Sequence, residues 1–247
     1  MERGMKIGIF SDIHGNLPAF EAVLGFLDGK VEKYVCCGDI VGYGPYPNEC
    51  VEKISALPDV ICVAGNHDWA VLGLEDLSKF NDEARTAVKW TKEQLSPVSS
   101  SFLMGLDYKL AGPNFIAVHG SLIDPLDQYV KTAEDYIPSM KKQDRSILFV
   151  GHSHQPLYFR GTGGSVDFGA FIPLKPVEIE EHSKYLINVG SVGQPRDGNP
   201  KAACVIYDED ARDVVLHRVE YDVQSVQKAV LEAGLPNALA ERLGKGA

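Results

Sequence analysis

Short apolar runs, each ended by glycine and a cluster of polar residues, divide this chain into blocks. One example is the run at residues 60–64, which stops at Gly65-Asn66-His67-Asp68. A short, β-branched apolar run with such an end predicts a buried strand. Runs of the same kind occupy residues 6–10, 34–37, 115–118 and 147–150. Because ligands of open α/β sheets bind at the carboxyl ends of the strands, we expect these polar clusters to share one site.

Helical periodicity appears between the first runs. Residues 17–27 carry Phe20, Val23, Leu24 and Leu27 at helical spacing, and residues 48–57 also predict a helix. The resulting β-α-β-α-β order is typical of a parallel sheet covered by helices. Residues 69–105 predict a mostly helical excursion, with one helix over residues 80–95 that starts at Asn81. Whether this excursion overhangs the site stays open.

The second half of the chain is richer in strands. After a predicted helix at residues 133–142, strands are expected at 157–160, 166–168, 185–189, 203–207 and 214–221. This run predicts a second, more antiparallel sheet that packs on the first. Residues 223–243 are predicted to be helical, and residues 244–247 are expected to fray. Since no repeat, low-complexity tract or linker interrupts the pattern, we predict a single domain over residues 1–247.

Composition is typical of a soluble globular protein, with 45% hydrophobic and 23% charged residues among 247. No apolar run approaches the roughly 20 residues that span a bilayer, and the N-terminus lacks a signal peptide. We therefore expect a cytoplasmic location and no membrane partner. The net charge of −10 disfavours extensive nucleic-acid binding through a basic surface. A small phosphate ester remains compatible, because bound cations reverse the local sign.

Five cysteines are present, and none lies in a C-x-x-C pair. Cys36, Cys37, Cys62 and Cys204 fall in strand-like apolar runs, where buried reduced thiols are expected. A disulfide framework is not expected in a chain of this size without a secretion signal. The oligomeric state stays open, and a homo-oligomer is compatible with the sequence.

Five of the seven histidines follow the strand-like runs directly, and acids or amides share the same turns. These residues are His14, His67, His119, His152 and His154, with Asp12, Asp39, Asn66 and Asp68. One such residue alone would be explained as a helix cap or a surface group, but five clusters together predict a metal site. Imidazole and carboxylate ligands suit Mn²⁺, Fe²⁺ or Zn²⁺ better than Mg²⁺ or Ca²⁺.

Two metal ions lying about 3.5–4 Å apart need a shared ligand. A carboxylate is the natural bridge, because each of its oxygens can take one ion. Asp39 stands alone after the second strand and is therefore the candidate bridge.

In chain order, the clusters are Asp12-x-His14, Gly38-Asp39, Gly65-Asn66-His67-Asp68, His119 and Gly151-His152-x-His154. Spread over most of the chain, they resemble the motifs of the calcineurin-like metallophosphoesterase superfamily. The resemblance implies an α/β fold of four layers, an α/β/β/α sandwich in which helices flank two mixed sheets. It also implies two divalent or trivalent metal ions, foremost Mn or Fe, with Zn, Ni and Co as alternatives. One ion would be held by Asp12, His14, Asp39 and His154. The other would be held by Asp39, Asn66, His119 and His152.

The sequence around the motifs is similar to that of small prokaryotic phosphoesterases, at residues 38–45, 119–121 and 188–198. Members of that group are described as phosphodiesterases or as hydrolases resembling diadenosine tetraphosphatase. The chain departs from the Ser/Thr protein phosphatases, which place an arginine shortly after the Gly-Asp motif. Gly42-Tyr43-Gly44 occupies that turn here, which disfavours protein phosphatase activity as the main role.

Catalytic roles follow from this chemistry. Two cations lower the pKa of a bridging water, so that hydroxide can attack phosphorus in line. His67, which the scheme does not need as a ligand, is predicted to protonate the leaving alkoxide as the general acid. Asp68 is predicted to orient the His67 ring. The alternative for His67 is a structural role, and the alternative for Asp68 is that of a simple helix cap or turn residue.

Substrate contacts are assigned to Arg196 and Asn66. Arg196 lies in the glycine-bounded loop at residues 193–198 and is predicted to bind the substrate phosphate in place of the missing arginine. The alternative is a surface salt bridge with Asp197 or another acid. Tyr43 and Tyr46 are candidates for stacking on a nucleobase, although exposed loop tyrosines need no such role.

The sequence thus predicts a metal-dependent phosphoesterase that acts on a small phosphate ester or nucleotide. A nuclease or a phosphoprotein phosphatase on the same site is the alternative among enzymes. A non-catalytic binding scaffold is a further alternative, but such a protein would be expected to lose ligands, and this chain retains all of them.

Overall fold

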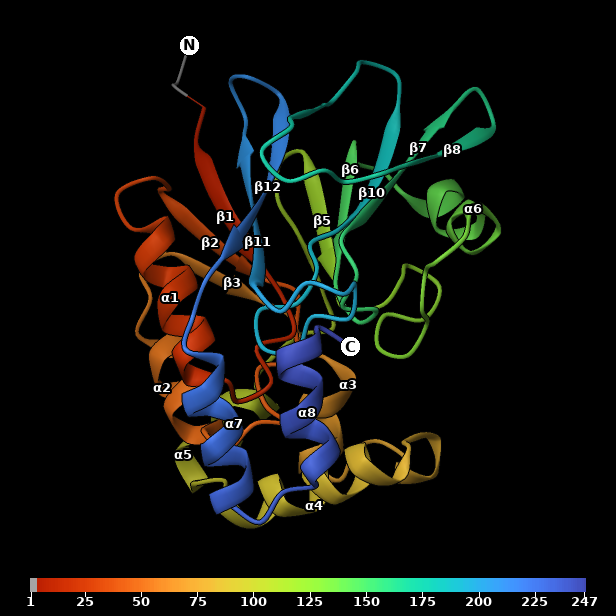
Figure 1. Cartoon of the computed structure of the whole chain (residues 1–247). Coiled ribbons are helices and arrows are strands. Elements are labelled where there is room, and N and C mark those ends of the chain that lie inside the picture. The colour runs from red at the N-terminus through yellow and green to blue at the C-terminus, as the bar shows by residue number, and fades with distance from the viewer. Residues whose placement is uncertain (1–3) are drawn as a thin grey trace.

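Two six-stranded sheets form the centre of the computed structural model, which describes residues 4–247 (Figure 1). The strands are β1 (Lys6–Phe10), β2 (Lys33–Cys36), β3 (Val60–Cys62), β4 (Lys109–Ala111), β5 (Phe115–Val118), β6 (Ile147–Val150), β7 (Leu157–Thr162), β8 (Ser165–Gly169), β9 (Val177–Glu178), β10 (Lys184–Asn188), β11 (Ala202–Asp208) and β12 (Asp213–Val219). The first sheet has the order β3-β2-β1-β11-β12-β9, and the second has the order β4-β5-β6-β10-β7-β8. Both sheets are mixed, with a parallel part that carries the polar clusters.

The strands after residue 157 divide between the two sheets, so the prediction that they form one separate antiparallel sheet was wrong. β11 pairs antiparallel with β1 and brings β12 with it into the first sheet. β10, in contrast, pairs parallel with β6 in the second sheet. Periodicity marks a segment as a strand, but the choice of neighbouring edge depends on tertiary packing.

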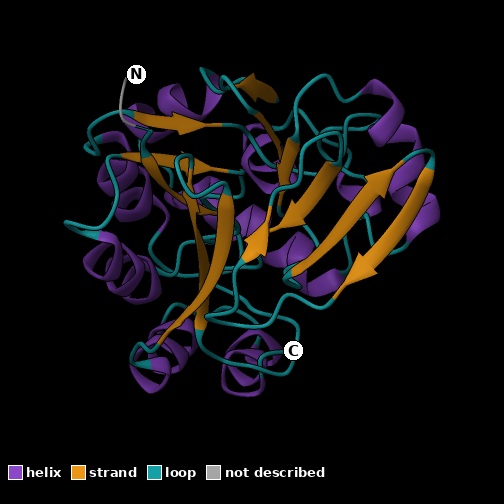
Figure 2. Ribbon diagram, turned by 90° about the horizontal axis from the view of Figure 1, so that it is seen from above, coloured by secondary structure: helices purple, strands orange, loops and turns teal. Residues whose placement is uncertain are grey.

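Helices cover both outer faces of the paired sheets. They are α1 (Leu17–Leu27), α2 (Pro47–Ser55), α3 (Asn66–Leu72), α4 (Asp82–Gln94), α5 (Pro97–Met104), α6 (Ala133–Lys142), α7 (Val223–Glu232) and α8 (Asn237–Lys245), with a 3₁₀ turn η1 (Leu77–Lys79). α1 contacts β11 and β12, whereas α6 contacts β7, β8 and β10. Figure 2 shows the strands in the middle with helices around them. The predicted α/β/β/α sandwich is confirmed.

Local chemistry explains where several helices begin. The Asn16 side chain accepts the Ala19 N–H at 3.2 Å at the start of α1, and Asn81 accepts the Ala84 N–H at 2.8 Å at the start of α4. Each bond satisfies a backbone donor that has no partner inside the helix. The predicted start of the helix at Asn81 is therefore confirmed.

The predicted helical segment at residues 223–243 consists of two helices. Gly234, with φ of 72°, and Pro236 separate α7 from α8, since neither residue suits a helix interior. The predicted fraying of residues 244–247 was also wrong for most of that segment. α8 runs to Lys245, and the Gly246 carbonyl accepts the Gly198 N–H at 2.8 Å.

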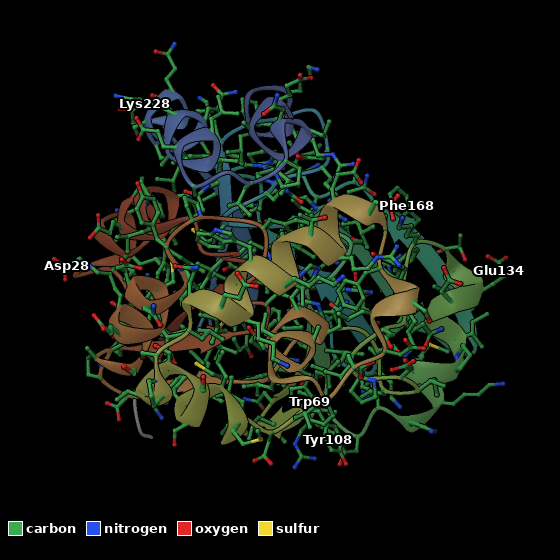
Figure 3. All side chains as sticks on the ribbon, turned by 90° about the horizontal axis from the view of Figure 1, so that it is seen from below. Asp28, Trp69, Tyr108, Glu134, Phe168 and Lys228 are labelled. Atoms are coloured by element: carbon green, nitrogen blue, oxygen red, sulfur yellow. The ribbon has the colours of Figure 1, made fainter. Side chains whose placement is uncertain are left out.

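The core lies on both faces of the first sheet. Along β1, Ile7 and Ile9 pack between the sheets, while Phe10 packs against the helices. A strand buried on both faces is apolar throughout, which explains the unbroken apolar run in the sequence. Asp28, Glu134 and Lys228 point outward from the surface (Figure 3). Within residues 4–247, no helix is long and apolar enough to cross a membrane.

Candidate metal centre and active site

The polar clusters that follow β1, β2, β3, β5 and β6 meet at one place. Their ligand atoms form three groups, in each of which the atoms lie within 4.8 Å of one another. The groups are Asp12–His14–His154, Asp39–His119–His152 and His14–Asp39–His67, and every member is buried. The structure therefore brings together the residues that the sequence predicted to share one site.

One histidine pair is arranged with its ring nitrogens face to face. His14 Nε2 lies 3.1 Å from His154 Nε2, and 3.2 Å separate His154 Nε2 from Asp12 Oδ1. Each ring uses its other nitrogen on a backbone carbonyl: His14 Nδ1 lies 3.1 Å from the Val41 oxygen, and His154 Nδ1 lies 2.6 Å from the Gln194 oxygen. A carbonyl can only accept, so in the neutral rings both Nδ1 atoms carry the proton. Two lone pairs then face each other, an arrangement that a cation between them would stabilise.

A second pair repeats this arrangement with the roles of the nitrogens changed in one ring. His119 Nε2 lies 3.1 Å from His152 Nδ1. Their other nitrogens lie 2.8 Å from the Cys37 carbonyl oxygen and 3.0 Å from the Asp127 carbonyl oxygen. In the neutral rings, the backbone thus directs two pairs of unprotonated nitrogens at each other, which is the form in which histidine binds metals.

Asp39 lies between the two pairs. Its Oδ2 is 3.5 Å from His14 Nε2 and 3.2 Å from His119 Nε2, while its Oδ1 accepts the His67 backbone N–H at 2.9 Å. The prediction of Asp39 as the shared residue fits this position. The expectation that each oxygen would serve one ion does not, since Oδ2 faces both pairs and Oδ1 is engaged by the backbone.

Asn66 completes the donor set. Its Oδ1 is buried and has no hydrogen-bond partner among the described residues. A buried, unpartnered amide oxygen is costly unless a ligand satisfies it. The buried His, Asp and Asn donors therefore fit two metal ions. Their division into two sets of four stays a prediction.

Burial and charge shift the pKa values of these groups in opposite directions. Burial favours neutral Asp12 and Asp39, but the histidines beside them, His154 and His119 respectively, hold the pKa of each carboxyl below its usual range. Burial would lower the pKa of His119, yet Asp39 outweighs it and raises this pKa to about 9. The site thus has a strong affinity for positive charge.

The backbone at the site is held in an unusual conformation. Nine non-glycine residues of the described chain have positive φ, and five of them are predicted metal ligands. These are Asp12, His14, Asp39, His152 and His154, with φ between 50° and 64°. Each costs about 1–2 kcal/mol relative to ordinary backbone, and such residues concentrate at functional sites.

Asp68 does not orient the His67 ring, contrary to prediction. Its carboxylate accepts four backbone N–H groups, those of Asp39, Ile40, Val41 and Gly65, at 2.9–3.1 Å. It caps the start of α3 and ties that helix to the loop that carries Asp39. Asp68 therefore holds the backbone of the site in place.

His67 differs from the four paired histidines. Its Nδ1 is buried beside Gly42 and has no partner in the part of the chain that the structure describes, so no carbonyl sets its tautomer. Its ring lies 4.5 Å from that of Tyr43 and 5.0 Å from that of Phe80, centroid to centroid. Burial lowers its pKa to about 4, with Asp39 opposing the shift.

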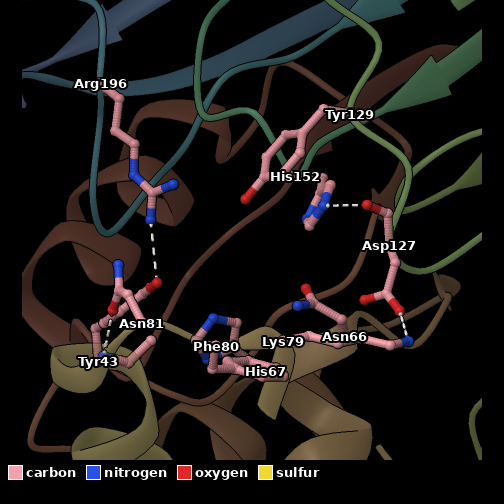
Figure 4. Close-up of a pocket in the computed structure, with 11 residues that line it drawn as sticks. Tyr43, Asn66, His67, Lys79, Phe80, Asn81, Asp127, Tyr129, His152 and Arg196 are labelled. Carbon is pink, nitrogen blue, oxygen red and sulfur yellow. Dashed lines mark hydrogen bonds and ion pairs between the residues drawn. The ribbon is translucent and has the colours of Figure 1, made fainter. Parts of the chain in front are cut away.

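A cavity of about 340 Å³ opens above the site and contains His67, Asn66 and His152 in its wall. Arg196 lies on the same wall and donates to the Tyr43 hydroxyl at 3.2 Å and to Gln194 Oε1 at 2.9 Å (Figure 4). The alternative of an Asp197–Arg196 salt bridge was wrong, because Asp197 pairs with Arg218. Tyr46 lies at the start of α2 rather than in the cavity wall.

A model of the calcineurin-like phosphoesterase superfamily domain matches residues 5–211. The chain belongs to the calcineurin-like phosphoesterase superfamily. It is 38% identical over 245 residues to an uncharacterised protein of Methanocaldococcus jannaschii, covering 97% of this chain and 98% of that protein. A crystal structure of a metallophosphoesterase from Sphaerobacter thermophilus is 40% identical, with a TM-score of 0.90 and coverage of 99% and 100%. Phosphodiesterase YfcE of Escherichia coli is 26% identical over 221 residues, which cover 85% of this chain and 91% of YfcE.

Sequence reasoning missed several residues that line the cavity of this phosphoesterase domain. Lys79 and Phe80, from the helical excursion, and Asp127 and Tyr129, from the loop after β5, all lie in its wall. The Tyr129 ring stacks on that of His152 at 3.9 Å, centroid to centroid. Neither segment has a motif that marks it, although the abrupt change to helical pattern after residue 69 was a signal that the excursion matters.

Proposed function

We propose that this protein is a metal-dependent phosphoesterase that hydrolyses small phosphodiesters or nucleotides. The observation that carries the proposal is the arrangement of two histidine pairs around Asp39. In each pair, two ring nitrogens lie 3.1 Å apart. When bound there, two metal ions would make a water molecule acidic enough to supply hydroxide and would neutralise charge on the phosphate. Mn and Fe suit this mixed imidazole and carboxylate set best.

His67 is the proton donor in this proposal. Its ring lies in the cavity wall, and unlike the four paired histidines it is not held by a backbone carbonyl. An anionic phosphate ester beside the ring would favour its protonated form, against the effect of burial. The ring can then give its proton to the leaving oxygen, with in-line attack from the opposite side.

Arg196 binds the substrate through an anionic group. Its guanidinium contacts the neutral Tyr43 hydroxyl and Gln194 amide, and no carboxylate of residues 4–247 forms an ion pair with it. The bond to Tyr43 holds the guanidinium over the cavity, with donors left for a phosphate or carboxylate.

The cavity favours a small substrate over a macromolecule. Its volume of about 340 Å³ lies at the lower end of the range for small-molecule pockets. The net charge of −10 adds to this, because a nuclease surface is usually basic. The similarity to phosphodiesterase YfcE supports a diester substrate. A cytoplasmic location and the oligomeric state stay predictions.

Metal analysis and turnover of bis(p-nitrophenyl) phosphate by the Mn²⁺-loaded protein test the proposal. We expect two metal equivalents and hydrolysis that chelation abolishes. The His67→Ala variant should keep both metals and lose most turnover of a diester with an alkyl leaving group, because an alkoxide needs a proton to depart. His217→Gln, at a histidine on β12, should behave as wild type. Arg196→Ala should raise KM, with the metals retained, for a diester that carries a further anionic group.

A protein without bound metal or activity would favour the binding-scaffold alternative. Wild-type turnover of a diester with an alkyl leaving group by His67→Ala would overturn the role of His67. A panel of nucleotides, cyclic nucleotides, dinucleoside polyphosphates and phosphopeptides then narrows the substrate and tests the phosphoprotein phosphatase alternative.

A further inference from the structure

The two ends of the cavity differ in charge. In Figure 4, Arg196 and Tyr43 lie at one end, and the Lys79–Asp127 pair lies at the other, beyond Asn66. The centre is formed by the predicted ligands Asn66 and His152, where the scissile phosphate would lie. A substrate that is longer than its phosphate must therefore reach toward one end, the other, or both.

The Arg196 end has an excess of positive charge. The contacts of the guanidinium are neutral groups, the Tyr43 hydroxyl at 3.2 Å and the Gln194 amide oxygen at 2.9 Å. Both contacts use the same terminal nitrogen, Nη2, so the other donors of the guanidinium are available. In Figure 4 the Tyr129 hydroxyl points toward this end and adds a polar group.

At the opposite end, the one cation among the described residues that line the cavity, Lys79, is already paired. Lys79 Nζ lies 2.5 Å from Asp127 Oδ2 and 3.2 Å from Glu75 Oε2. One ammonium between two carboxylates leaves this end with a net charge of −1, which repels an additional anion. Among the residues that line the cavity in the described chain, Arg196 is therefore the cation available to a second anionic group of the substrate.

The proposed general acid lies toward the Arg196 end. The His67 ring is 4.5 Å from the ring of Tyr43, whose hydroxyl accepts from Arg196. Because the general acid must reach the leaving oxygen, the leaving group departs toward this end. The substituent that stays on phosphorus then points toward Lys79 and Asp127.

From this arrangement we infer that the enzyme selects phosphodiesters whose leaving group carries a second anionic group, which Arg196 binds. A leaving group that is a phosphorylated alcohol, or a phosphate released from a phosphoanhydride, has this chemistry. The inference rests on the proposed phosphodiesterase function and on His67 as its acid. Stacking of a base on Tyr129 is not part of it, because His152 at 3.9 Å and the Lys131 ammonium at 4.6 Å lie against that ring.

Three chromogenic diesters separate the two ends. Methyl 4-nitrophenyl phosphate carries no additional charge, methyl 3-carboxy-4-nitrophenyl phosphate carries it on the leaving phenol, and 2-carboxyethyl 4-nitrophenyl phosphate carries it on the retained group. For the Mn²⁺-loaded protein, the measured quantity is a ratio. It is the kcat/KM of each carboxylated diester divided by the kcat/KM of methyl 4-nitrophenyl phosphate. Comparison of this ratio between variants cancels the different leaving abilities of the phenols.

We expect Arg196→Gln to lower the ratio for the charged leaving group by about tenfold, as for the loss of one charge-assisted contact. Arg196→Lys should restore part of the ratio, and Arg160→Gln, at an arginine on β7 outside the cavity, should keep the wild-type value. Asp127→Asn should raise the ratio for the charged retained group, because it removes one of the two carboxylates beside Lys79 and with it the net negative charge of that end. Melting temperature and metal content of each variant show that the site is intact.

An unchanged ratio in Arg196→Gln, with turnover retained, would overturn the inference and leave the proposed function standing. A preference for the charged retained group that depends on Arg196 would also overturn it. If the metal-loaded wild type hydrolysed none of the three diesters, the proposed function itself would fail.

Discussion

Replacement of His67 by Gln should make the metal-free protein less sensitive to acid. In the folded chain, burial lowers the pKa of His67 from 6.5 to about 4. The unfolded chain therefore binds a proton at this position between these two pH values, whereas the folded chain does not. Stability that depends on a neutral His67 is lost as the pH falls from about 6.5 toward 4.

The size of this effect follows from the two pKa values, 6.5 and about 4. At pH 7 the folded ring is deprotonated and the unfolded ring mostly so, and the penalty on folding is only about 0.2 kcal/mol. At pH 5 the unfolded ring is almost fully protonated, and the penalty reaches about 2 kcal/mol. Since Gln does not titrate, this pH-dependent penalty is absent from the variant.

Urea unfolding of both chelated proteins at pH 7 and pH 5 measures the difference. Relative to wild type, His67→Gln should gain about 2 kcal/mol on going from pH 7 to pH 5, whatever its fixed cost of substitution. His67→Asn should show the same gain, because the effect comes from loss of the titrating ring and not from side-chain size. A stability difference that stays constant between the two pH values would refute the reasoning.

Three further predictions concern the backbone of the site and the buried cysteines. In Gly65→Ala, the new Cβ would lie 2.0 Å from Asp39 Oδ1, so we expect reduced metal stoichiometry; two equivalents bound at wild-type affinity would contradict this contact. Asp68→Ala leaves four backbone N–H groups without their acceptor and should lower the free energy of unfolding by about 3 kcal/mol or more, as measured by urea titration. An unchanged free energy of unfolding would show that water replaces the carboxylate. All five cysteines are free and buried, and burial raises the pKa of Cys204 to about 12. A thiol reagent should therefore label none of them in the folded protein and all five in denaturant. Rapid labelling of the folded protein would contradict this, because it would show that the structure around the cysteines opens readily.

Much of the fold and of the site could be predicted because the signals are local. Unbroken apolar runs mark β1 and the other doubly buried strands, and Asn81 marks the start of α4 through a bond only three residues long. The polar residues that end the strands, such as Asp39 and His119, announce a shared site because parallel strands end at the same edge.

Tertiary structure alone decided how the strands are shared and how the site works. β11 joins β1 across nearly two hundred residues of chain, a choice of edge that hydrophobic periodicity does not contain. The tautomers of the paired histidines depend on carbonyls such as that of Gln194, 40 residues from His154. Asp68 binds the backbone of the Asp39 loop instead of its neighbour His67, and Lys79 pairs with Asp127 at one end of the cavity. Residue type and spacing thus determined which chemical groups gather at the site, because they depend on local order; their directions and partners depend on contacts between distant segments, which only the folded chain brings into reach.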